Sequence, residues 1–383
     1  MYSSDVGITA ALGDFVIDGL AFRYSNFVRR LYNFCQSLGF ERGKILPSRA
    51  FCSDESQGYP IILIAKHFGA FPFNHGRVGG VVSTDRHGPY AEHGKDLVII
   101  HASHVGYDPQ THSFGSYRRM HTQHCEMRSN CGKMALVLDW YLNEYAFATQ
   151  NIFLERHSGH FMVTIDNYLL RENKAEGLFL NMPSIVLSEE GGKCHPIRSY
   201  STSKCYLASH ELRALMGDAA WPSSGRRPID EWLLPELFRF KRNIPEDLET
   251  DSYLEHNLLN AMASIVTSKT PLLTAAQVNT QMEFDRAYRT IVNAAEYRGK
   301  QLVFISGLNI DISPQEGQVF PLTKFVPWAA FVQRANGHAL LLEQKDLFQA
   351  LLNQPESNSD AVNLEAAIQT MEDTDEIRIK LLQ

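Results

Sequence analysis

The chain of 383 residues lacks the features that mark several classes of protein. No uninterrupted apolar run reaches the ~20 residues that a membrane-spanning helix needs. The first residues carry aspartates and lack a basic segment followed by a clean apolar core, so we expect no signal peptide. The net charge of -7 argues against a general nucleic-acid-binding surface. We therefore expect a cytoplasmic protein with no membrane and no nucleic-acid partner.

Cysteine is also scarce, with six residues spread thinly over the whole chain. This usage is typical of reduced thiols, for which metal binding or catalysis is a better interpretation than a disulfide framework. Hydrophobic residues make up 44% of the sequence and charged residues 21%, as in ordinary globular proteins. The length suffices for one large α/β domain or two ordinary ones.

The order of apolar patterns predicts an α/β fold. Helical spacing is expected over residues 22–38, 134–148, 254–268, 275–297 and 341–352, with a weaker helix at 363–371. Short apolar runs predict buried strands at 60–65, 97–100, 302–305 and 320–332; residues 161–165 and 178–180 are strands or turns, and 221–245 is irregular. Continuous apolar strands that alternate with helices favour a mostly parallel central sheet with helices on both faces.

Three residues in the first third of the chain have the chemistry of metal ligands, namely Cys52, His104 and Cys131. Two thiolates and one imidazole suit Zn²⁺ and leave its fourth position free, which separates a catalytic zinc from a structural one. We expect His104 just past the strand at 97–100, at the carboxyl edge of the sheet. His101 is the rival ligand, but it continues the strand directly and is interpreted as a wall or supporting residue.

Two charged residues are expected beside the metal. Asp54 is two residues from Cys52, so in an extended segment the two side chains point the same way. Left alone, this carboxylate would displace the water on the metal and close the site. A guanidinium would hold it back through a bidentate pair, and Arg77 in the glycine-rich loop is the candidate.

Other histidines and cysteines are less convincing ligands. The run His121-Thr122-Gln123-His124-Cys125 could bind a metal by itself, but it offers no fourth ligand at a usual spacing, so a metal-free loop is the better interpretation. Four further histidines near the site are expected to be hydrogen-bonded or on the surface, although one could shuttle protons. They are His67, His75, His87 and His93.

The candidate residues lie within a pattern of short motifs. In chain order these are Cys52-x-Asp54-Glu55, Gly69-Ala70-Phe71-Pro72-Phe73, Gly76-Arg77-Val78-Gly79, a strand ending in His104-Val105-Gly106, Cys131-Gly132, and Val303-Phe304-Ile305-Ser306-Gly307 with Asn309. The pattern resembles the limiting-CO2-inducible protein B family, which is related to β-carbonic anhydrases. The resemblance is dense over residues 50–135 and thinner up to 330.

This resemblance implies a β-carbonic-anhydrase-like fold, usually a homodimer, with Zn²⁺ held by Cys52, His104 and Cys131. It also implies an Asp54–Arg77 dyad that orients a zinc hydroxide for attack on CO2, in the reversible hydration of CO2 to bicarbonate. Two departures alter the pocket walls but remove no ligand. Ala102-Ser103 stands where the family often has Gly-Pro, and Asn130 where it often has a second cysteine.

We therefore predict a zinc-dependent carbonic anhydrase whose CO2 pocket is lined by Phe71, Phe73, Val105 and Gly106. One alternative is a catalytically silent, zinc-stabilised binding or regulatory protein of the same fold. Another is a zinc hydrolase for a small amide or ester that uses the same open position.

Three regions are expected along the chain. Residues 1–45 form an N-terminal helical segment that packs on the core, and residues 46–353 form the zinc-binding α/β catalytic domain with insertions. Residues 354–383 form an acidic tail, which we interpret as a solvated appendage.

Overall fold

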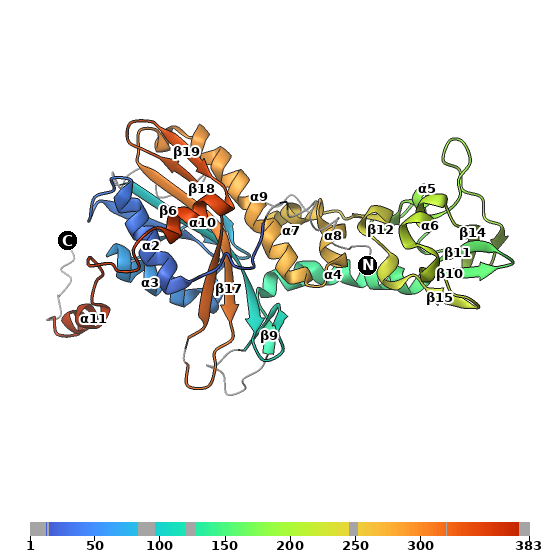
Figure 1. The fold of residues 1–383 in the computed structure, drawn as a ribbon, viewed down its shortest axis with the longest axis horizontal. Coiled ribbons are helices and arrows are strands. Elements are labelled where there is room, and N and C mark those ends of the chain that lie inside the picture. Colours follow the sequence, from blue (N-terminus) through green and yellow to red (C-terminus); the bar gives the residue numbers. More distant parts are fainter. Residues whose placement is uncertain are drawn as a thin grey trace, which may run out of the picture. The chain divides into compact units, whose positions relative to one another are not determined.

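The structure is a computed structural model that describes residues 13, 15–82, 96–118, 127–244, 252–318 and 320–374 (Figure 1). The chain divides into two compact units. The main-sheet unit comprises residues 16–104, 120–124 and 283–383, and the five-strand unit comprises residues 1–15, 105–119 and 125–282. No helix among the described ranges has the length and apolar character needed to cross a bilayer.

The main sheet has the strand order β1-β18-β17-β6-β2-β3, with β19 paired to β18 and β7 paired to β6. Its strands are β1 (Phe22–Arg23), β2 (Ile45–Ala50), β3 (Phe73–Asn74), β6 (Asp96–Asp108), β7 (Ser113–Phe114), β17 (Leu302–Ile312), β18 (Leu322–Gln333) and β19 (Ala339–Leu342). Strand β2 runs parallel to β3 and β6, whereas β1, β17 and β19 run antiparallel to β18. The predicted α/β class is confirmed, and the sheet is mixed rather than purely parallel.

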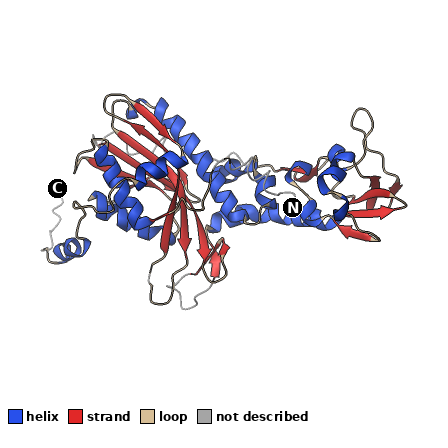
Figure 2. Ribbon diagram, viewed as in Figure 1, coloured by secondary structure: helices blue, strands red, loops and turns tan. Residues whose placement is uncertain are grey.

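Helices cover both faces of the main sheet (Figure 2). One face packs against α2 (Tyr24–Ser37), α3 (Gly58–Phe68) and α10 (Gln344–Leu352). The other face packs against the later part of α9 (Pro271–Asn293), through Phe284, Ala287 and Ile291. Because both faces are covered, the central strands are almost entirely buried, which explains why their sequences are continuously apolar.

The strand predicted at residues 60–65 is wrong, because these residues belong to α3. The run of apolar residues is too short to tell a strand from a buried helix by its period alone. The residues at its two ends are typical of a helix. Pro60 lies in the first helical turn, where a missing N–H costs nothing, and Gly69 ends the helix with φ 72°, a left-handed conformation that glycine adopts easily.

Most other elements occur where they were predicted, with different bounds. The helices at 22–38, 134–148 and 363–371 are confirmed as α2, α4 (Gly132–Asn151) and α11 (Leu364–Glu372). The strand at 97–100 is confirmed but continues to Asp108, and the one at 302–305 continues to Ile312. Residues 254–268 form two helices, α7 (Ser252–Leu259) and α8 (Met262–Thr267). The predicted helix 341–352 begins only at Gln344, after β19.

The five-strand unit contains an antiparallel sheet with the order β13-β14-β11-β10-β15. Its strands are β10 (Ile152–His157), β11 (His160–Asp166), β13 (Arg198–Ser199), β14 (Ser203–Leu207) and β15 (Arg226–Pro228). A separate pair is formed by β12 (Gly177–Leu180) and β16 (Phe238–Lys241), and the short helices are α5 (Met182–Ile185) and α6 (His210–Met216). Helix α4 is tied to α7 by Tyr141, whose hydroxyl donates to Glu255 at 2.7 Å.

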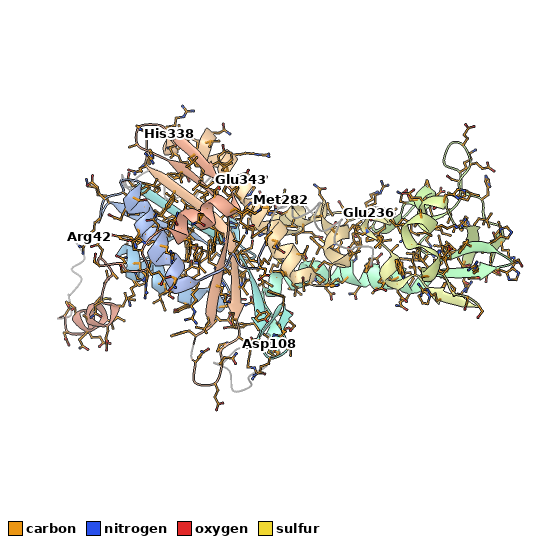
Figure 3. The ribbon with its side chains drawn as sticks, in the orientation of Figure 1. Arg42, Asp108, Glu236, Met282, His338 and Glu343 are labelled. Atoms are coloured by element: carbon orange, nitrogen blue, oxygen red, sulfur yellow. The ribbon has the colours of Figure 1, made fainter. Side chains whose placement is uncertain are left out.

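Residues 356–362, which follow α10, are hydrogen-bonded to the main-sheet unit, so the prediction of a solvated appendage is wrong for this stretch. The buried Arg30 guanidinium donates to the carboxylate of Glu356 at 2.7 Å. Asp360 accepts from the Tyr32 hydroxyl at 2.8 Å and pairs with Arg42 at 2.9 Å (Arg42 is labelled in Figure 3). Glu356 and Asp360 therefore hold this segment against the main-sheet unit through specific hydrogen bonds and ion pairs.

Candidate metal centre

Cys52, His104 and Cys131 come together as one buried group. Their exposed fractions are 4%, 1% and 2%, and one ligand atom from each lies within 4.8 Å of the other two. A tetrahedral zinc ion with Zn–S of about 2.3 Å and Zn–N of about 2.0 Å would place such atoms roughly 3.5 to 3.8 Å apart. Two sulfurs and an imidazole nitrogen that are buried and converge to within 4.8 Å are a donor set that suits a zinc ion.

Cys52 follows β2, and the glycine-rich segment packs against this part of the chain. A side chain on Gly76 would place its Cβ 2.3 Å from the carbonyl oxygen of Phe51, so only glycine allows this approach. The backbone N–H of Gly79 donates to the Cys52 sulfur at 3.2 Å. This hydrogen bond favours the anionic thiolate that a metal requires.

His104 lies inside β6 and not beyond its end, which corrects the expectation from the sequence. Its Nδ1 is 2.9 Å from Oδ2 of Asp311, and both side chains are fully buried. Burial raises the pKa of Asp311, and the hydrogen bond and charge of His104 act in the opposite direction. Asp311 was not among the predicted site residues.

His101 points to the other face of the sheet, because residues three apart on a strand have opposite directions. Its Nδ1 lies 2.7 Å from the Ser306 hydroxyl, and its Nε2 lies 2.9 Å from the carbonyl oxygen of Gly80. Burial lowers its pKa to about 4, so the ring is neutral at physiological pH. The group of converging ligand atoms contains His104 and not His101.

Cys131 is the residue immediately before α4, at the positive end of the helix dipole. The preceding Asn130 is fixed by its backbone. Its carbonyl accepts from Gly106 N–H at 3.0 Å, and its own N–H donates to Gly115 at 3.1 Å. A Cβ on Gly106 would lie 2.6 Å from the Ser116 carbonyl oxygen, so glycine is needed at this position.

The predicted Asp54–Arg77 dyad stays a prediction. The Asp54 carboxylate accepts from Ser56 N–H at 3.2 Å and so begins a short 3-10 helix, Glu55–Gln57. Its charge makes a small contribution to the raised pKa of Asp311, after the larger effect of burial. Arg77 lies exposed in β4 (Gly76–Arg77), and its guanidinium forms no ion pair within the described part of the chain.

The four predicted pocket residues differ in burial. Val105 is fully buried and Gly106 is buried beside it in β6, whereas Phe73 is half-buried and Phe71 is 77% exposed. Their role as walls for CO2 stays a prediction. Phe71 could line a pocket only if another surface covered its ring, and the described residues of this chain leave the ring exposed.

The remaining histidines have different outcomes. His87, His93, His121 and His124 lie outside the described residues, as does Cys125. His67 is hydrogen-bonded to Asn358, as expected.

His75 contradicts the expectation of a surface or hydrogen-bonded ring. It is 3% exposed, and neither ring nitrogen has a hydrogen-bond partner among the residues described. Burial lowers its pKa to about 3, with smaller contributions from His101 and Arg49.

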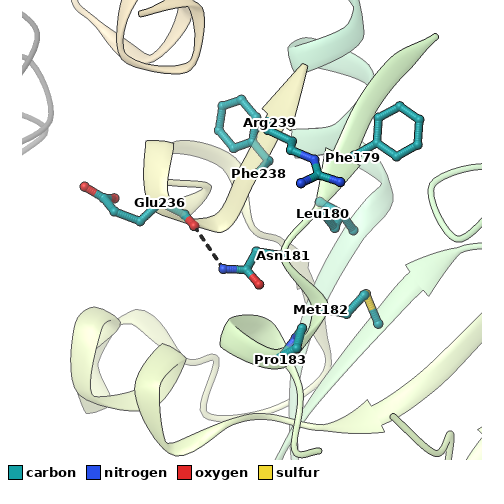
Figure 4. A pocket seen from close by; sticks show the side chains of 8 residues that line it. All are labelled: Phe179, Leu180, Asn181, Met182, Pro183, Glu236, Phe238 and Arg239. Atoms are coloured by element: carbon teal, nitrogen blue, oxygen red, sulfur yellow. Dashed lines mark hydrogen bonds between the residues drawn. The ribbon is translucent and has the colours of Figure 1, made fainter. Parts of the chain in front are cut away.

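The five-strand unit has a separate cavity of about 480 Å³ between β12, β16 and α5 (Figure 4). Its lining residues are Phe179, Leu180, Asn181, Met182, Pro183, Glu236, Phe238 and Arg239. The Asn181 amide donates to the backbone carbonyl of Glu236 at 3.5 Å. The cavity contains none of the candidate metal ligands, so the sequence-based site and this cavity are distinct.

No family model matches the sequence, and no match is found among curated proteins. Solved structures do show a likeness. PtLCIB4, a homologue of the limiting CO2-inducible protein LCIB, has a TM-score of 0.48 and 11% sequence identity, over 88% of this chain and 98% of that chain. LCIB itself has a TM-score of 0.43 and 12% identity, over 85% of this chain and 96% of that chain. The likeness is one of fold.

Proposed function

We propose that the chain binds one zinc ion through Cys52, His104 and Cys131 and catalyses the reversible hydration of CO2 to bicarbonate. The observation that carries the proposal is the convergence of two buried thiols and one buried imidazole. This is the donor set expected from the family resemblance, and it offers three protein ligands, as catalytic zinc sites do. A homodimer and a cytoplasmic location belong to the same proposal.

A zinc ion held there would supply the Lewis acidity that makes water a usable nucleophile near neutral pH. The residues of the chain do the rest. The Gly79 N–H and the N-terminus of α4 stabilise the negative charge on the two thiolates. In the proposal, the Asp54 carboxylate accepts a hydrogen bond from the attacking water and turns its lone pair toward CO2. Arg77 holds Asp54 in this role, and Val105 supplies an apolar wall.

The test is stopped-flow CO2 hydration on protein whose zinc content has been measured. We expect about one zinc per chain and rapid hydration, both lost in Cys52→Ser. Cys205→Ser is the matched control, since Cys205 is a buried thiol outside the group and its loss should leave both intact. Asp54→Asn should keep zinc and lose at least about 100-fold in hydration rate, as for a lost general acid–base group. A protein that contains no zinc would overturn the proposal.

A second candidate is the zinc-stabilised binding or regulatory protein without turnover. The exposure of Arg77, and the absence of an ion pair for it in the described ranges, favour this candidate over an assembled dyad. Bound zinc in the absence of hydration at any pH, with unfolding promoted by a chelator, would support it. Hydration that depends on Asp54 would exclude it.

A further inference from the structure

We propose that Asp311 is a positioning residue of the candidate metal centre. Its carboxylate accepts a hydrogen bond from His104 and so holds the proton of that ring on Nδ1. The lone pair on Nε2 is then available to a metal ion. The consequence for metal binding rests on the function proposed above. The tautomer itself is a property of the protein without metal and can be measured separately.

The direction of the hydrogen bond follows from the donors around Asp311. Oδ2 lies 2.9 Å from His104 Nδ1, accepts from the Ser56 hydroxyl at 2.9 Å and from the Gln57 amide at 2.7 Å. Oδ1 accepts from the Thr323 hydroxyl at 3.2 Å. Gln57 Nε2 can only donate, and the Ser56 and Thr323 hydroxyls donate here, so both carboxyl oxygens act as acceptors. His104 therefore donates through Nδ1, and its second nitrogen carries the lone pair.

The orientation of the Gln57 amide is itself fixed. Asn309 donates through its side-chain amide to Gln57 Oε1 at 2.7 Å, which directs Gln57 Nε2 toward Asp311. Asn309 and Asp311 are two residues apart on β17, so they face the same side of the sheet. The chain of hydrogen bonds thus has one consistent direction, from Asn309 through Gln57 to the carboxylate.

Stability alone does not explain a carboxylate at this place. Asp311 is 0% exposed, and within the described part of the chain no Lys or Arg side chain lies within ion-pair distance of it. Burying a charge is costly even when hydrogen bonds satisfy it, and an apolar residue is often as stable there. A carboxylate that holds one nitrogen of a ligating histidine, however, sets the tautomer and the ring orientation, and its removal typically weakens metal binding by 10- to 100-fold.

The first experiment is nitrogen-15 NMR of histidine-labelled, metal-free protein. We expect His104 to carry its proton on Nδ1 in the wild type and to lose this preference in Asp311→Ala. A wild-type His104 with its proton on Nε2 would overturn the proposal. This result is independent of whether the protein is a carbonic anhydrase.

The second experiment measures zinc affinity by competition with a chromogenic chelator. Asp311→Ala should bind zinc 10- to 100-fold more weakly. Asp311→Asn keeps an acceptor oxygen without the charge, so a smaller loss is expected, and it serves if Asp311→Ala does not fold. Cys205→Ser is the control, because Cys205 is a buried thiol outside the metal group and outside the hydrogen bonds around Asp311. Unchanged affinity in a folded Asp311 variant would overturn this proposal alone, whereas a wild type that binds no zinc would overturn the proposed function with it.

Discussion

The buried ring of His75 predicts a loss of stability in mild acid that one substitution should reduce. The ordinary pKa of 6.5 falls to about 3 in the folded protein, because burial disfavours the charged ring. The unfolded chain therefore binds a proton on His75 between these values and the folded chain does not. A depressed histidine pKa means that the stability contribution is present above pH 6.5 and is lost as the pH falls toward about 3.

The size of this effect depends little on the folded pKa. Protonation of a free histidine with a pKa of 6.5 stabilises the unfolded state by roughly 2 kcal/mol at pH 5 relative to pH 7. A folded pKa of 3 or 4 changes this figure by less than about 0.1 kcal/mol, since either value lies well below pH 5. Between pH 7 and pH 5, the free energy of unfolding of His75→Leu should therefore fall by about 2 kcal/mol less than that of the wild type. It should also gain about 1 kcal/mol at pH 7, because the substitution removes two buried nitrogens that have no partner among the described residues.

The assay is urea denaturation at pH 7, 6 and 5, with the free energy of unfolding compared between variants. His67 and His101 have pKa values lowered to about 4, so the wild type itself should lose more than His75 alone explains. The exposed His338 (labelled in Figure 3) provides the control, and His338→Gln should follow the wild type at every pH. Equal slopes for the wild type and His75→Leu would refute the reasoning.

Three further substitutions test other parts of the fold. Tyr24→Phe should stabilise the protein by about 1 kcal/mol in thermal unfolding, because the buried Tyr24 hydroxyl has no partner among the described residues; a destabilised variant would contradict this. Arg30→Lys should cost about 2 kcal/mol in urea denaturation, since an ammonium cannot replace the guanidinium that donates to Glu356 and to the carbonyl of Gln354; an unchanged midpoint would show that these bonds contribute nothing. Gly106→Ala should cost 1 to 3 kcal/mol or more in the same assay, because of the close approach of the Ser116 carbonyl, and a neutral result would exclude that approach.

Local chemistry identified the three candidate metal ligands from the sequence. Cys52 and Cys131 are thiols beside a glycine-rich segment and a helix start, and His104 follows an apolar run. The structure brings these three residues into one buried group, as expected from their residue types.

The supporting residues could not be found in the same way, because their contacts join distant parts of the chain. Gln57 and Asp311 are separated by 254 positions, and Ser56 and Asp311 by 255. One signal was nevertheless present. Asn309 and Asp311 are polar residues at alternate positions of a strand that is otherwise almost wholly apolar, and buried polar groups require partners.

The alternation of β6 and β17 explains why one sheet holds two separate histidine environments. On β6, Val98, Ile100 and His104 share the face covered by α2 and α3, while Leu97, Ile99 and His101 share the face covered by α9. The neighbouring strand β17 follows the same rule, so Asp311 faces His104 and Ser306 faces His101.

A shift of one residue in β17 would turn Asp311 to the other face and place an apolar neighbour, Ile310 or Ile312, beside the candidate ligand His104. The antiparallel partner β18 does carry an irregularity here, since Ser306 pairs with Ala329 and Gly307 with Pro327, which leaves Trp328 as an extra residue. Because the extra residue is on β18, the alternation of β17 is uninterrupted through Asp311. The irregularity therefore lies on β18 and leaves β17, the strand that carries Asp311, unbroken.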